Sequence, residues 1–402
     1  MDEKFEKFEV IHRIVEQPVD HGDPKGEHFP QHVDILIPLD APKNAPVFFH
    51  LGEEHDLDKE DLLLLYSAYG KRDDIIYIQA EHRGYGQSIT TDKDQSIPSY
   101  VRINQALDDY HEVIEKLKED FSGPWMGAGY SYGGGLIINF GAKYPTDLDV
   151  ILSSSGVIDW PFTMDAYDRQ MRINFGENLY NGIVKHINKL QPDELFDDNW
   201  LEREFIIAAC HGLAQREELK KVQPAFEKMM ELRTEELLER LHDIDEKLAE
   251  GEGWQYATSN GKITLSRKEA LTGKYTWRVW RYQQCTETGV FEISSQPNGI
   301  FTRKHEDFVE ESIALFNEEP PAARAKDWSP RSMINDLKAP LVYVCGGHDP
   351  WKGLCLEQNH KIKNGRYFFY QEGRHCPEKD KLRRGKEVMN KLLKYATSKT
   401  NN

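Results

Sequence analysis

The sequence predicts an α/β protein that has a mostly parallel central sheet with helices on both of its faces. Three observations support this prediction. Apolar runs of strand length alternate with amphipathic runs of helix length over residues 32–156. The same alternation resumes near residue 339, after a long stretch of helical periodicity. Within the first part, a serine flanked by glycines stands where a strand gives way to a helix.

The strands and helices follow from periodicity, taken in chain order. The first two strands flank turn residues at 20–24 and are expected to pair antiparallel, whereas the next ones are continuous apolar runs typical of strands buried on both faces. The expected strands are 5–14, 32–38, 45–51, 75–80, a short one before residue 131, 150–156, 339–346 and 365–371. The expected helices are 59–69, 99–121, one after the serine, and 377–396.

Residues 157–335 interrupt this alternation. They are rich in charge and helical in periodicity, and no pair of buried strands is expected among them. Because the sheet pattern resumes afterwards, we interpret them as an inserted helical cap. The core is then expected to consist of residues 1–156 and 336–402.

Composition narrows the function classes. The net charge of −17 over 402 residues argues against a nucleic-acid surface and against anionic lipid. The apolar runs, such as residues 62–65, are too short to span a bilayer, and the charged N-terminus has no apolar leader, so we expect a cytoplasmic protein. The five cysteines lack C-x-x-C spacing, which predicts reduced thiols and no metal site. No organic cofactor is indicated, and the sequence leaves the oligomeric state open.

The chemistry is expected at Ser131. It is the centre of a G-x-S-x-G motif whose glycines, Gly129 and Gly133, are required where a tight strand-to-helix turn forces strained backbone angles. The N–H of Tyr132 then points to where the carbonyl oxygen becomes negative in acyl transfer. A second such oxyanion donor is expected from the loop after the strand 45–51, at Gly52 or Glu53.

A nucleophilic serine needs a base and a group that orients the base. Asp349 follows the strand 339–346, and His375 follows the strand 365–371. The order serine, acid, histidine is that of the α/β-hydrolases, and both loops lie at carboxyl ends of strands, where open α/β sheets hold their sites. His348 is a competing polar candidate. We expect activity to fall at acid pH, because protonated His375 cannot accept the serine proton.

Five motifs stand out along the chain: 81–88 (EHRGYGQS), 129–134 (GYSYGG), 143–145 (KYP), 283–291 (QQCTETGVF) and 349–351 (DPW). Together they resemble the proline-directed serine peptidases, which include prolyl carboxypeptidase, dipeptidyl peptidase II and related bacterial prolyl tripeptidyl aminopeptidases. The resemblance implies a triad of Ser131, Asp349 and His375, a helical cap, and cleavage after proline from one end of a peptide. The chain departs from the family pattern at residues 52–55, where animal members have an asparagine, and at Tyr132, where bacterial members often have lysine.

Substrate recognition is expected from carboxylates and aromatic rings. Glu53, Glu54 and Glu287 are candidates to bind the ammonium of a free N-terminus, although surface charge in an acidic protein is the plainer explanation. Arg83 is expected to form a buried structural ion pair with Glu81. The candidates for the wall of a proline pocket are Trp351, Trp277, Trp280 and Tyr282.

The function predicted from the sequence is a serine exopeptidase that releases di- or tripeptides from the free N-terminus of short proline-containing peptides. Three alternatives stay open at this stage. The fold also suits a carboxylic ester hydrolase, and the family resemblance also admits a prolyl carboxypeptidase acting at the C-terminus. A binding protein that kept the fold without catalysis is the third alternative.

Overall fold

The structure is a computed structural model of the chain. It describes residues 3–90, 98–159, 163–195, 197–215, 219–238, 240, 258–259, 262–263, 276–289, 293, 295, 298–320 and 330–398. The chain divides into two compact units, and each unit is described by itself. The first comprises residues 1–159, 325–347 and 355–402, and the second comprises 160–324 and 348–354.

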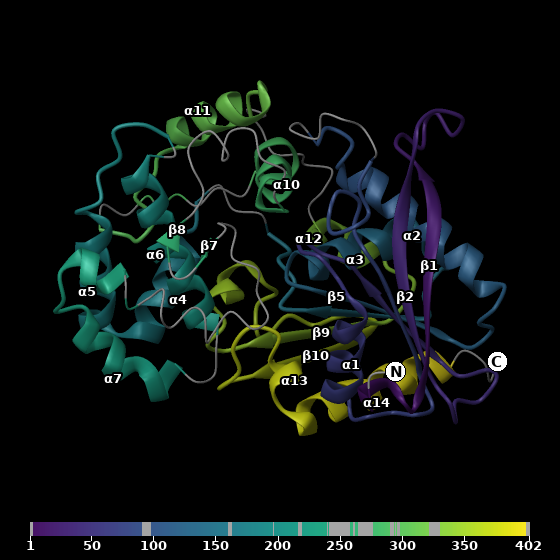
Figure 1. The fold of residues 1–402 in the computed structure, drawn as a ribbon. Helices are drawn as coiled ribbons and strands as arrows, with labels where there is room; N and C mark the ends of the chain where they lie inside the picture. Colours follow the sequence, from purple (N-terminus) through teal and green to yellow (C-terminus); the bar gives the residue numbers. More distant parts are fainter. Residues whose placement is uncertain are drawn as a thin grey trace. The chain divides into compact units, whose positions relative to one another are not determined.

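An eight-stranded sheet forms the centre of the first unit (Figure 1), in the order β1-β2-β4-β3-β5-β6-β9-β10. Strand β2 pairs antiparallel with β1 and with β4, and all other neighbours are parallel. This arrangement confirms the predicted α/β class. The strands are β1 (Phe8–Pro18), β2 (His28–Pro38), β3 (Val47–Leu51), β4 (Ile76–Ala80), β5 (Trp125–Tyr130), β6 (Val150–Ser154), β9 (Leu341–Gly346) and β10 (Gly365–Tyr370).

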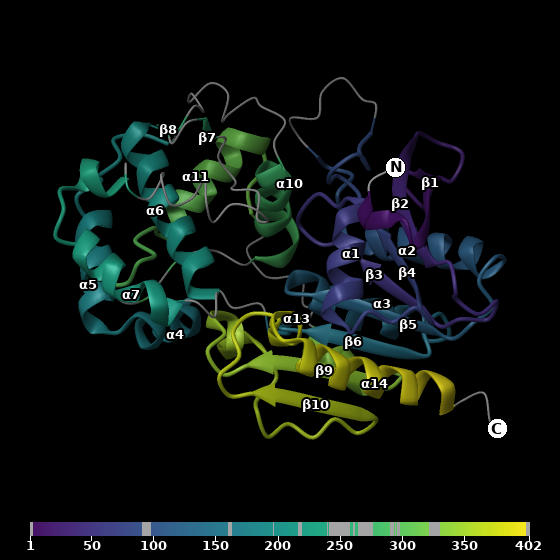
Figure 2. The ribbon, with the colours of Figure 1, turned by 60° about the horizontal axis from the view of Figure 1, so that its bottom comes forward.

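The strands at the centre of the sheet are apolar because helices cover both of its faces. Successive residues of a strand point to opposite faces. Phe48 of β3 therefore contacts Tyr69, next to α1 (Lys59–Ala68), at 5.1 Å between ring centroids, while Phe49 contacts Tyr110 of α2 (Ile103–Lys118) at 6.5 Å. Helix α14 (Leu382–Ser398) shares the core cluster of the Phe48 face. Figure 2 shows α14 running beside the sheet.

The observed strands and helices agree with the periodicity to within four residues, except that the single helix expected at 377–396 is divided into α13 (Pro377–Asp380) and α14. The first strand is one of those whose ends shift. The sequence predicted 5–14, but β1 extends to Pro18 because it pairs with β2 along its whole length, from Phe8 opposite Pro38 to Pro18 opposite His28. Helix α3 (Tyr132–Lys143) follows the serine. The remaining short elements of the first unit are η1 (Glu3–Phe5), α12 (Pro330–Met333) and η4 (Ile334–Asp336).

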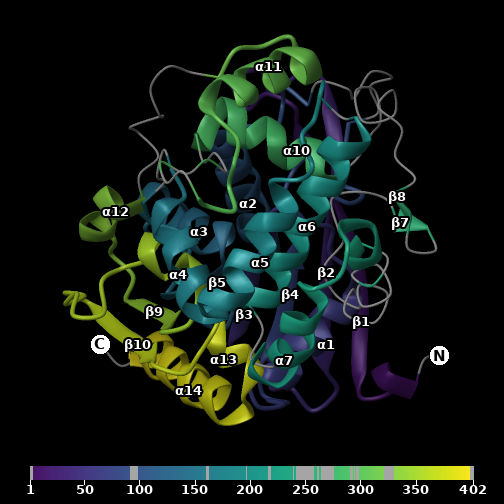
Figure 3. The ribbon, with the colours of Figure 1, turned by 90° about the vertical axis from the view of Figure 1, so that its left-hand side faces the viewer.

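The second unit is mainly helical (Figure 3), and α4, α5, α6 and α7 pack against one another. The unit also contains a two-stranded antiparallel sheet of β7 (Thr258–Ser259) and β8 (Lys262–Ile263), which the periodicity does not indicate. So short a pair carries no alternating apolar signal. The helices of the unit are α4 (Asp165–Phe175), α5 (Glu177–Ile187), α6 (Asp198–Gln215), α7 (Leu219–Met229), α10 (Thr276–Gln283), η2 (Gln284–Thr288), α11 (His305–Phe316) and η5 (Pro350–Leu354).

A buried ion cluster lies inside the second unit. Glu311 is fully buried and bridges Arg281, at 3.2 Å, and Arg303. The Arg303 guanidinium also lies 3.8 Å from the centre of the Phe308 ring. Two cations around one carboxylate lower the pKa of Glu311, although burial opposes this. Removing one partner of such a cluster leaves an uncompensated buried charge, so the cluster ties α10 to α11.

Across the described part of the chain, no helix combines the length and the apolar character that crossing a bilayer would require.

Candidate active site

Ser131 occupies a strained turn between β5 and α3. Its backbone angles are φ 51° and ψ −120°, a region that residues with a side chain rarely adopt. A Cβ atom on Gly129 would lie 2.0 Å from the carbonyl oxygen of Gly133, and one on Gly133 would lie 2.7 Å from Oε2 of Glu53. Glycine is therefore required on both sides of the serine, as the sequence motif predicts.

Backbone hydrogen bonds hold Ser131 in this turn. Its N–H donates to the Ser154 carbonyl at 3.0 Å, and its carbonyl accepts from Gly134 N–H at 3.0 Å and Val157 N–H at 3.3 Å. The neighbours Tyr130 and Tyr132 are buried, whereas Ser131 is partly exposed. The turn thus presents the serine side chain to solvent from an otherwise buried segment.

The two loop residues expected as oxyanion donors differ in their backbone. The Gly52 N–H donates to the Ala80 carbonyl at 2.9 Å, and is therefore already engaged. The Glu53 N–H makes no hydrogen bond within the described residues. Tyr132 is the first residue of α3, where helix N–H groups lack intrahelical acceptors. Of the sequence candidates, Tyr132 and Glu53 thus have the backbone suited to an oxyanion.

The Glu53 side chain points inward. Its Oε2 lies 3.0 Å from Nε2 of His50, and the residue is 4% exposed. Burial would raise the pKa of this carboxyl, but the charge of His50 and its hydrogen bond lower it below the ordinary value, with smaller contributions from His55 and Lys379. The pair fixes the backbone of the loop that carries the Glu53 N–H. Glu54 is half-buried as a residue, although its Oε2 atom is buried.

His375 lies in the loop between β10 and α13 and is half-buried. The next residue, Cys376, has a φ of 47°, and its N–H donates to the Ser155 hydroxyl at 2.9 Å. Ser131 and Cys376 are therefore anchored on consecutive residues, Ser154 and Ser155, at the end of β6. This anchoring brings the segments of Ser131 and His375 together.

The connection that carries Asp349 begins beside the same loop. A Cβ on Gly346 would lie 2.1 Å from the Arg374 carbonyl oxygen, and one on Gly347 would lie 2.2 Å from that of Gln371. Asp349 follows two residues later, within the segment 348–354 assigned to the second unit. It is fully buried, and its Oδ1 accepts the Trp351 N–H at 2.9 Å.

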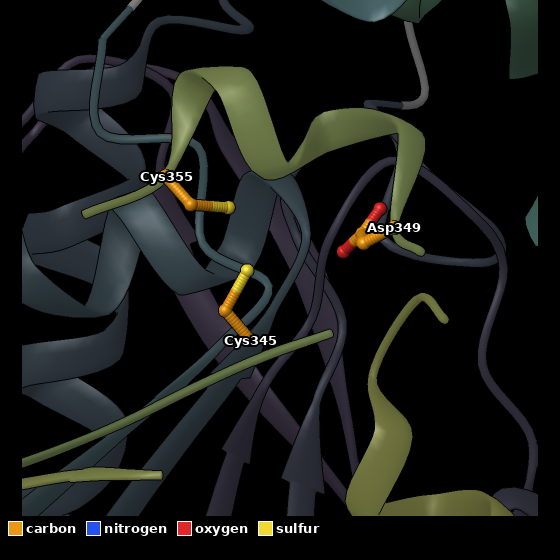
Figure 4. A group of neighbouring side chains, drawn as sticks. All are labelled: Cys345, Asp349 and Cys355. Atoms are coloured by element: carbon orange, nitrogen blue, oxygen red, sulfur yellow. The ribbon is translucent and has the colours of Figure 1, made fainter. Parts of the chain in front are cut away.

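Figure 4 shows Cys345 and Cys355 at the two ends of this connection, with Asp349 between them in the chain. Their sulfur atoms lie within 4.8 Å of each other, yet they form no disulfide. The other three cysteines, Cys210, Cys285 and Cys376, are also buried and form no disulfide.

The residues expected to contact substrate from the second unit are only partly accessible. Trp351 is half-buried and packs edge-on against Tyr167, at 4.7 Å between ring centroids. Glu287, on η2, and Trp280 are half-buried as well. Tyr282 is fully buried, and its hydroxyl donates to Glu318 at 3.3 Å. Their roles toward substrate stay predictions.

The ion pair expected between Arg83 and Glu81 is absent, which corrects the sequence interpretation. Arg83 instead binds both oxygens of the fully buried Asp109 on α2, at 2.6 Å each. Glu81 accepts hydrogen bonds from backbone N–H groups and from the Ser88 hydroxyl at 2.8 Å. Arg83 and Asp109 are 26 residues apart, and no local spacing marks such a pair.

Sequence reasoning missed several groups that surround the serine turn. His50 pairs with Glu53, and Nε2 of His82 lies 3.2 Å from the Tyr132 hydroxyl oxygen. Burial lowers the pKa of His82 to about 4, so its ring is neutral at neutral pH. His50 lies outside the motifs, and His82 lies within the motif 81–88 without being marked there as a site residue. The only available signal is a polar residue inside or directly after an apolar strand.

Taken together, the eight-stranded sheet order, the helices on both faces and the serine on the turn between β5 and α3 define an α/β-hydrolase. Residues 39–189 match the model of the family Serine carboxypeptidase S28. This match covers β3 to α5 and includes Ser131. It supports a serine peptidase on this fold, in line with the resemblance noted in the sequence.

Solved structures with a similar fold were also found. A proline iminopeptidase from Mycobacterium smegmatis is 14% identical, with 96% of this chain and 100% of that chain covered and a TM-score of 0.44. A putative dipeptidyl aminopeptidase IV from Bacteroides ovatus is 10% identical, with 96% and 36% covered and a TM-score of 0.44. An α/β fold family hydrolase from Bacillus anthracis is 13% identical, with 96% and 99% covered and a TM-score of 0.42. No curated protein sequence matches the chain.

Proposed function

We propose that the protein is a serine exopeptidase that cleaves short proline-containing peptides and releases di- or tripeptides from a free N-terminus. The observation that carries this proposal is Ser131, held at a φ of 51° between a buried strand and a helix N-terminus. A strain of this kind costs about 1–3 kcal/mol and persists at sites where it serves a function.

The proposed reaction proceeds through an acyl-enzyme. His375 takes the proton from the Ser131 hydroxyl as the oxygen attacks the carbonyl carbon of the scissile bond. The N–H groups of Tyr132 and Glu53 stabilise the resulting oxyanion. His375 then gives the proton to the leaving amine, and a water molecule, activated by the same histidine, releases the acyl group. Asp349 is proposed to hold the histidine in the tautomer that accepts the proton.

Among the three candidate carboxylates, Glu54 is the one we favour for the substrate ammonium. Glu53 already pairs with His50 and is 4% exposed, so binding a substrate would compete with a buried hydrogen bond. Glu287 and Trp351 are proposed to contact the peptide from the helical segment 157–335 and the segment after β9. This helical segment is proposed to act as a cap that restricts substrates to short peptides.

The test is fluorophore release from three substrates ending in a prolyl amide: a free dipeptide, a free tripeptide and an N-blocked tripeptide. We expect turnover of the free-amine substrates alone, and none with Ser131→Ala. Glu54→Gln should raise KM for the free-amine substrates at least tenfold, while Glu60→Gln, an exposed carboxylate on α1, should leave it unchanged. Equal turnover of the blocked peptide would contradict the exopeptidase proposal.

A prolyl carboxypeptidase is the second candidate, because the family whose model matches residues 39–189 is described as serine carboxypeptidases. This enzyme would release the residue that follows a penultimate proline, and would need donors for a carboxylate instead of Glu54. Peptides with a blocked N-terminus and a free C-terminus distinguish the two, because only a carboxypeptidase would cleave them. An ester hydrolase would turn over acyl esters but none of these amides.

We also propose the cytoplasm as the working compartment, on the ground that the five cysteines are buried and form no disulfide in the structure. Protein purified without reductant and unfolded in urea should release five titratable thiols per chain. Fewer thiols, restored to five by prior reduction, would indicate disulfides and an oxidising compartment.

A further inference from the structure

A chain of buried hydrogen bonds joins the segment of Ser131 to the segment of His375. The Tyr130 hydroxyl donates to the Tyr69 hydroxyl at 3.0 Å, and the Tyr69 hydroxyl donates to Oε1 of Glu378 at 3.0 Å. Tyr130 is directly before Ser131, and Glu378 is three residues after His375. Tyr69 lies at the C-terminal end of α1 and contributes only the middle of the chain. We call these three side chains the Tyr130–Tyr69–Glu378 chain.

All three members lie inside the first unit. Tyr69 and Glu378 are 0% exposed, and Tyr130 is 1% exposed. Burying a polar group lowers stability unless the group is hydrogen-bonded. Here three such groups from different elements are linked in series, and we expect this arrangement to have a role that compensates for its cost. The second carboxylate oxygen of Glu378 has no hydrogen-bond partner in the described part of the chain. The Tyr69 hydroxyl is therefore the group that holds this carboxylate in place.

The backbone is strained near both ends of the Tyr130–Tyr69–Glu378 chain. Ser131, Ser155 and Cys376 have φ values of 51°, 46° and 47°. Strained residues keep their conformation only where the surroundings over-determine it. Hydrogen bonds to Ser154 and Ser155 supply one restraint on the Ser131 and Cys376 segments, from the end of β6. The Tyr130–Tyr69–Glu378 chain supplies a second restraint, because it holds Tyr130, directly before Ser131, and Glu378, two residues after Cys376.

The direction of the hydrogen bonds is stable over a wide pH range. Burial, with the nearby Glu378 charge, holds the pKa of both phenols well above the ordinary value. Each hydroxyl therefore keeps its proton and remains a donor. The Lys379 ammonium lies 3.8 Å from the centre of the Tyr130 ring and places a positive charge against its face.

We propose that Tyr130, Tyr69 and Glu378 are positioning residues that fix the serine turn and the histidine loop relative to each other. This inference rests on the proposed function, because it assigns Ser131 and His375 the roles of nucleophile and base. The three side chains touch no reacting atom. They set the geometry in which the serine proton can pass to the histidine, and a misplacement of about 1 Å costs roughly a hundredfold in rate.

The test uses Tyr69→Phe, which removes one oxygen and keeps the ring. Tyr66→Phe is the matched control, because Tyr66 lies one turn earlier on α1 and its hydroxyl donates to Asp73 at 2.7 Å, outside the chain. The main readout is the rate constant for labelling of Ser131 by a fluorophosphonate, which needs no peptide substrate. We expect Tyr69→Phe to lower this rate, and kcat, about tenfold at unchanged KM, a loss equivalent to about 1.4 kcal/mol. Tyr66→Phe should change neither.

Tyr130→Phe keeps the proposal falsifiable if Tyr69→Phe folds poorly, since it removes only the end of the chain and leaves the bond between Tyr69 and Glu378 intact. The double variant should label no more slowly than Tyr69→Phe alone, because the two hydroxyls act as one unit. Equal labelling rates of the wild type, Tyr69→Phe and Tyr130→Phe would overturn the proposal and leave the proposed function standing. A wild-type protein that the probe does not label would instead overturn the proposed function, and this inference with it.

Discussion

At the scale of single residues, the site depends on strain that the surrounding chain holds in place. Ser131 has a φ of 51°, and the two glycines of its motif cannot carry a Cβ without meeting the Gly133 carbonyl or the Glu53 carboxylate. Strain of this kind lowers stability in return for the exposed position of the hydroxyl. The free-energy cost of this strain can be measured with a glycine at position 131, because glycine adopts positive φ without strain.

Ser131→Gly should therefore be more stable than Ser131→Ala. Both variants lack the hydroxyl, but only alanine keeps a Cβ at a φ of 51°. We expect the glycine variant to have a free energy of unfolding higher by about 1 kcal/mol. Urea unfolding followed by circular dichroism measures the difference. Equal stability of the two variants would mean that the turn is not strained.

Glu53→Gln tests the buried pair with His50. The charge-assisted hydrogen bond should contribute about 1–3 kcal/mol at pH 7. Because the pKa of Glu53 is lowered in the folded protein, this contribution is complete above the ordinary value of 4.5 and is lost as the pH falls through the lowered pKa. The difference in unfolding free energy between wild type and variant should thus shrink below about pH 4.5. A difference that is constant down to pH 3 would show that the pKa of Glu53 is not lowered in the folded state.

At the scale of elements, helix α3 can reach its place only because three glycines, Gly133 to Gly135, follow Tyr132 in its first turn. A Cβ on Gly134 would lie 2.5 Å from the Cα of Gly156, which is backbone and cannot rotate away. The same helix carries Gly141, where a Cβ would meet side-chain atoms of Ile151, at 2.2 Å, and Leu337, at 3.2 Å. The close approach of α3 to the segment after β6 therefore depends on Gly134 more than on Gly141.

Gly134→Ala should separate α3 from this segment and cost roughly 1–3 kcal/mol of stability, as overpacking does. It should also slow fluorophosphonate labelling, since the Ser131 N–H is held by the Ser154 carbonyl. Gly141→Ala is the control, because the side chains that its Cβ meets can change rotamer. Thermal unfolding and labelling of both variants decide the question, and a larger loss for Gly141→Ala would count against the close approach at Gly134.

At the scale of the whole molecule, buried neutral histidines make stability depend on pH. Burial lowers the pKa of His82, in the first unit, and of His211, in the second, from 6.5 to about 4. The unfolded chain binds these protons near pH 6.5, whereas the folded chain does so only near pH 4. The free energy of unfolding is therefore at its full value above pH 6.5 and falls as the pH drops toward 4.

Between pH 7 and pH 5 each of these histidines should account for a loss of about 2 kcal/mol. His82→Asn should remove its share, so the variant's unfolding free energy should fall less steeply over this range than that of the wild type. Urea unfolding at pH 7, 6 and 5 measures both slopes. Parallel slopes would mean that the pKa of His82 is not lowered in the folded protein.

Much of the architecture follows from the sequence. Continuous apolar runs such as residues 75–80 have only one stable arrangement, a strand covered on both faces, and Gly129 and Gly133 require a tight turn around Ser131. The local chain carries this information because periodicity and glycine requirements depend on neighbours in the sequence. The alternating class, the position of the serine and the loops that carry Asp349 and His375 could therefore be predicted without a structure.

The pairings around the site depended on the tertiary structure. Arg83 binds Asp109 instead of Glu81, Glu53 turns inward to His50, and Tyr69 connects the segments of Ser131 and His375. Each of these contacts, apart from the one between His50 and Glu53, joins residues far apart in the chain. Side-chain burial and hydrogen bonding are settled by which elements fold against each other, and a single sequence contains no local signal for that choice.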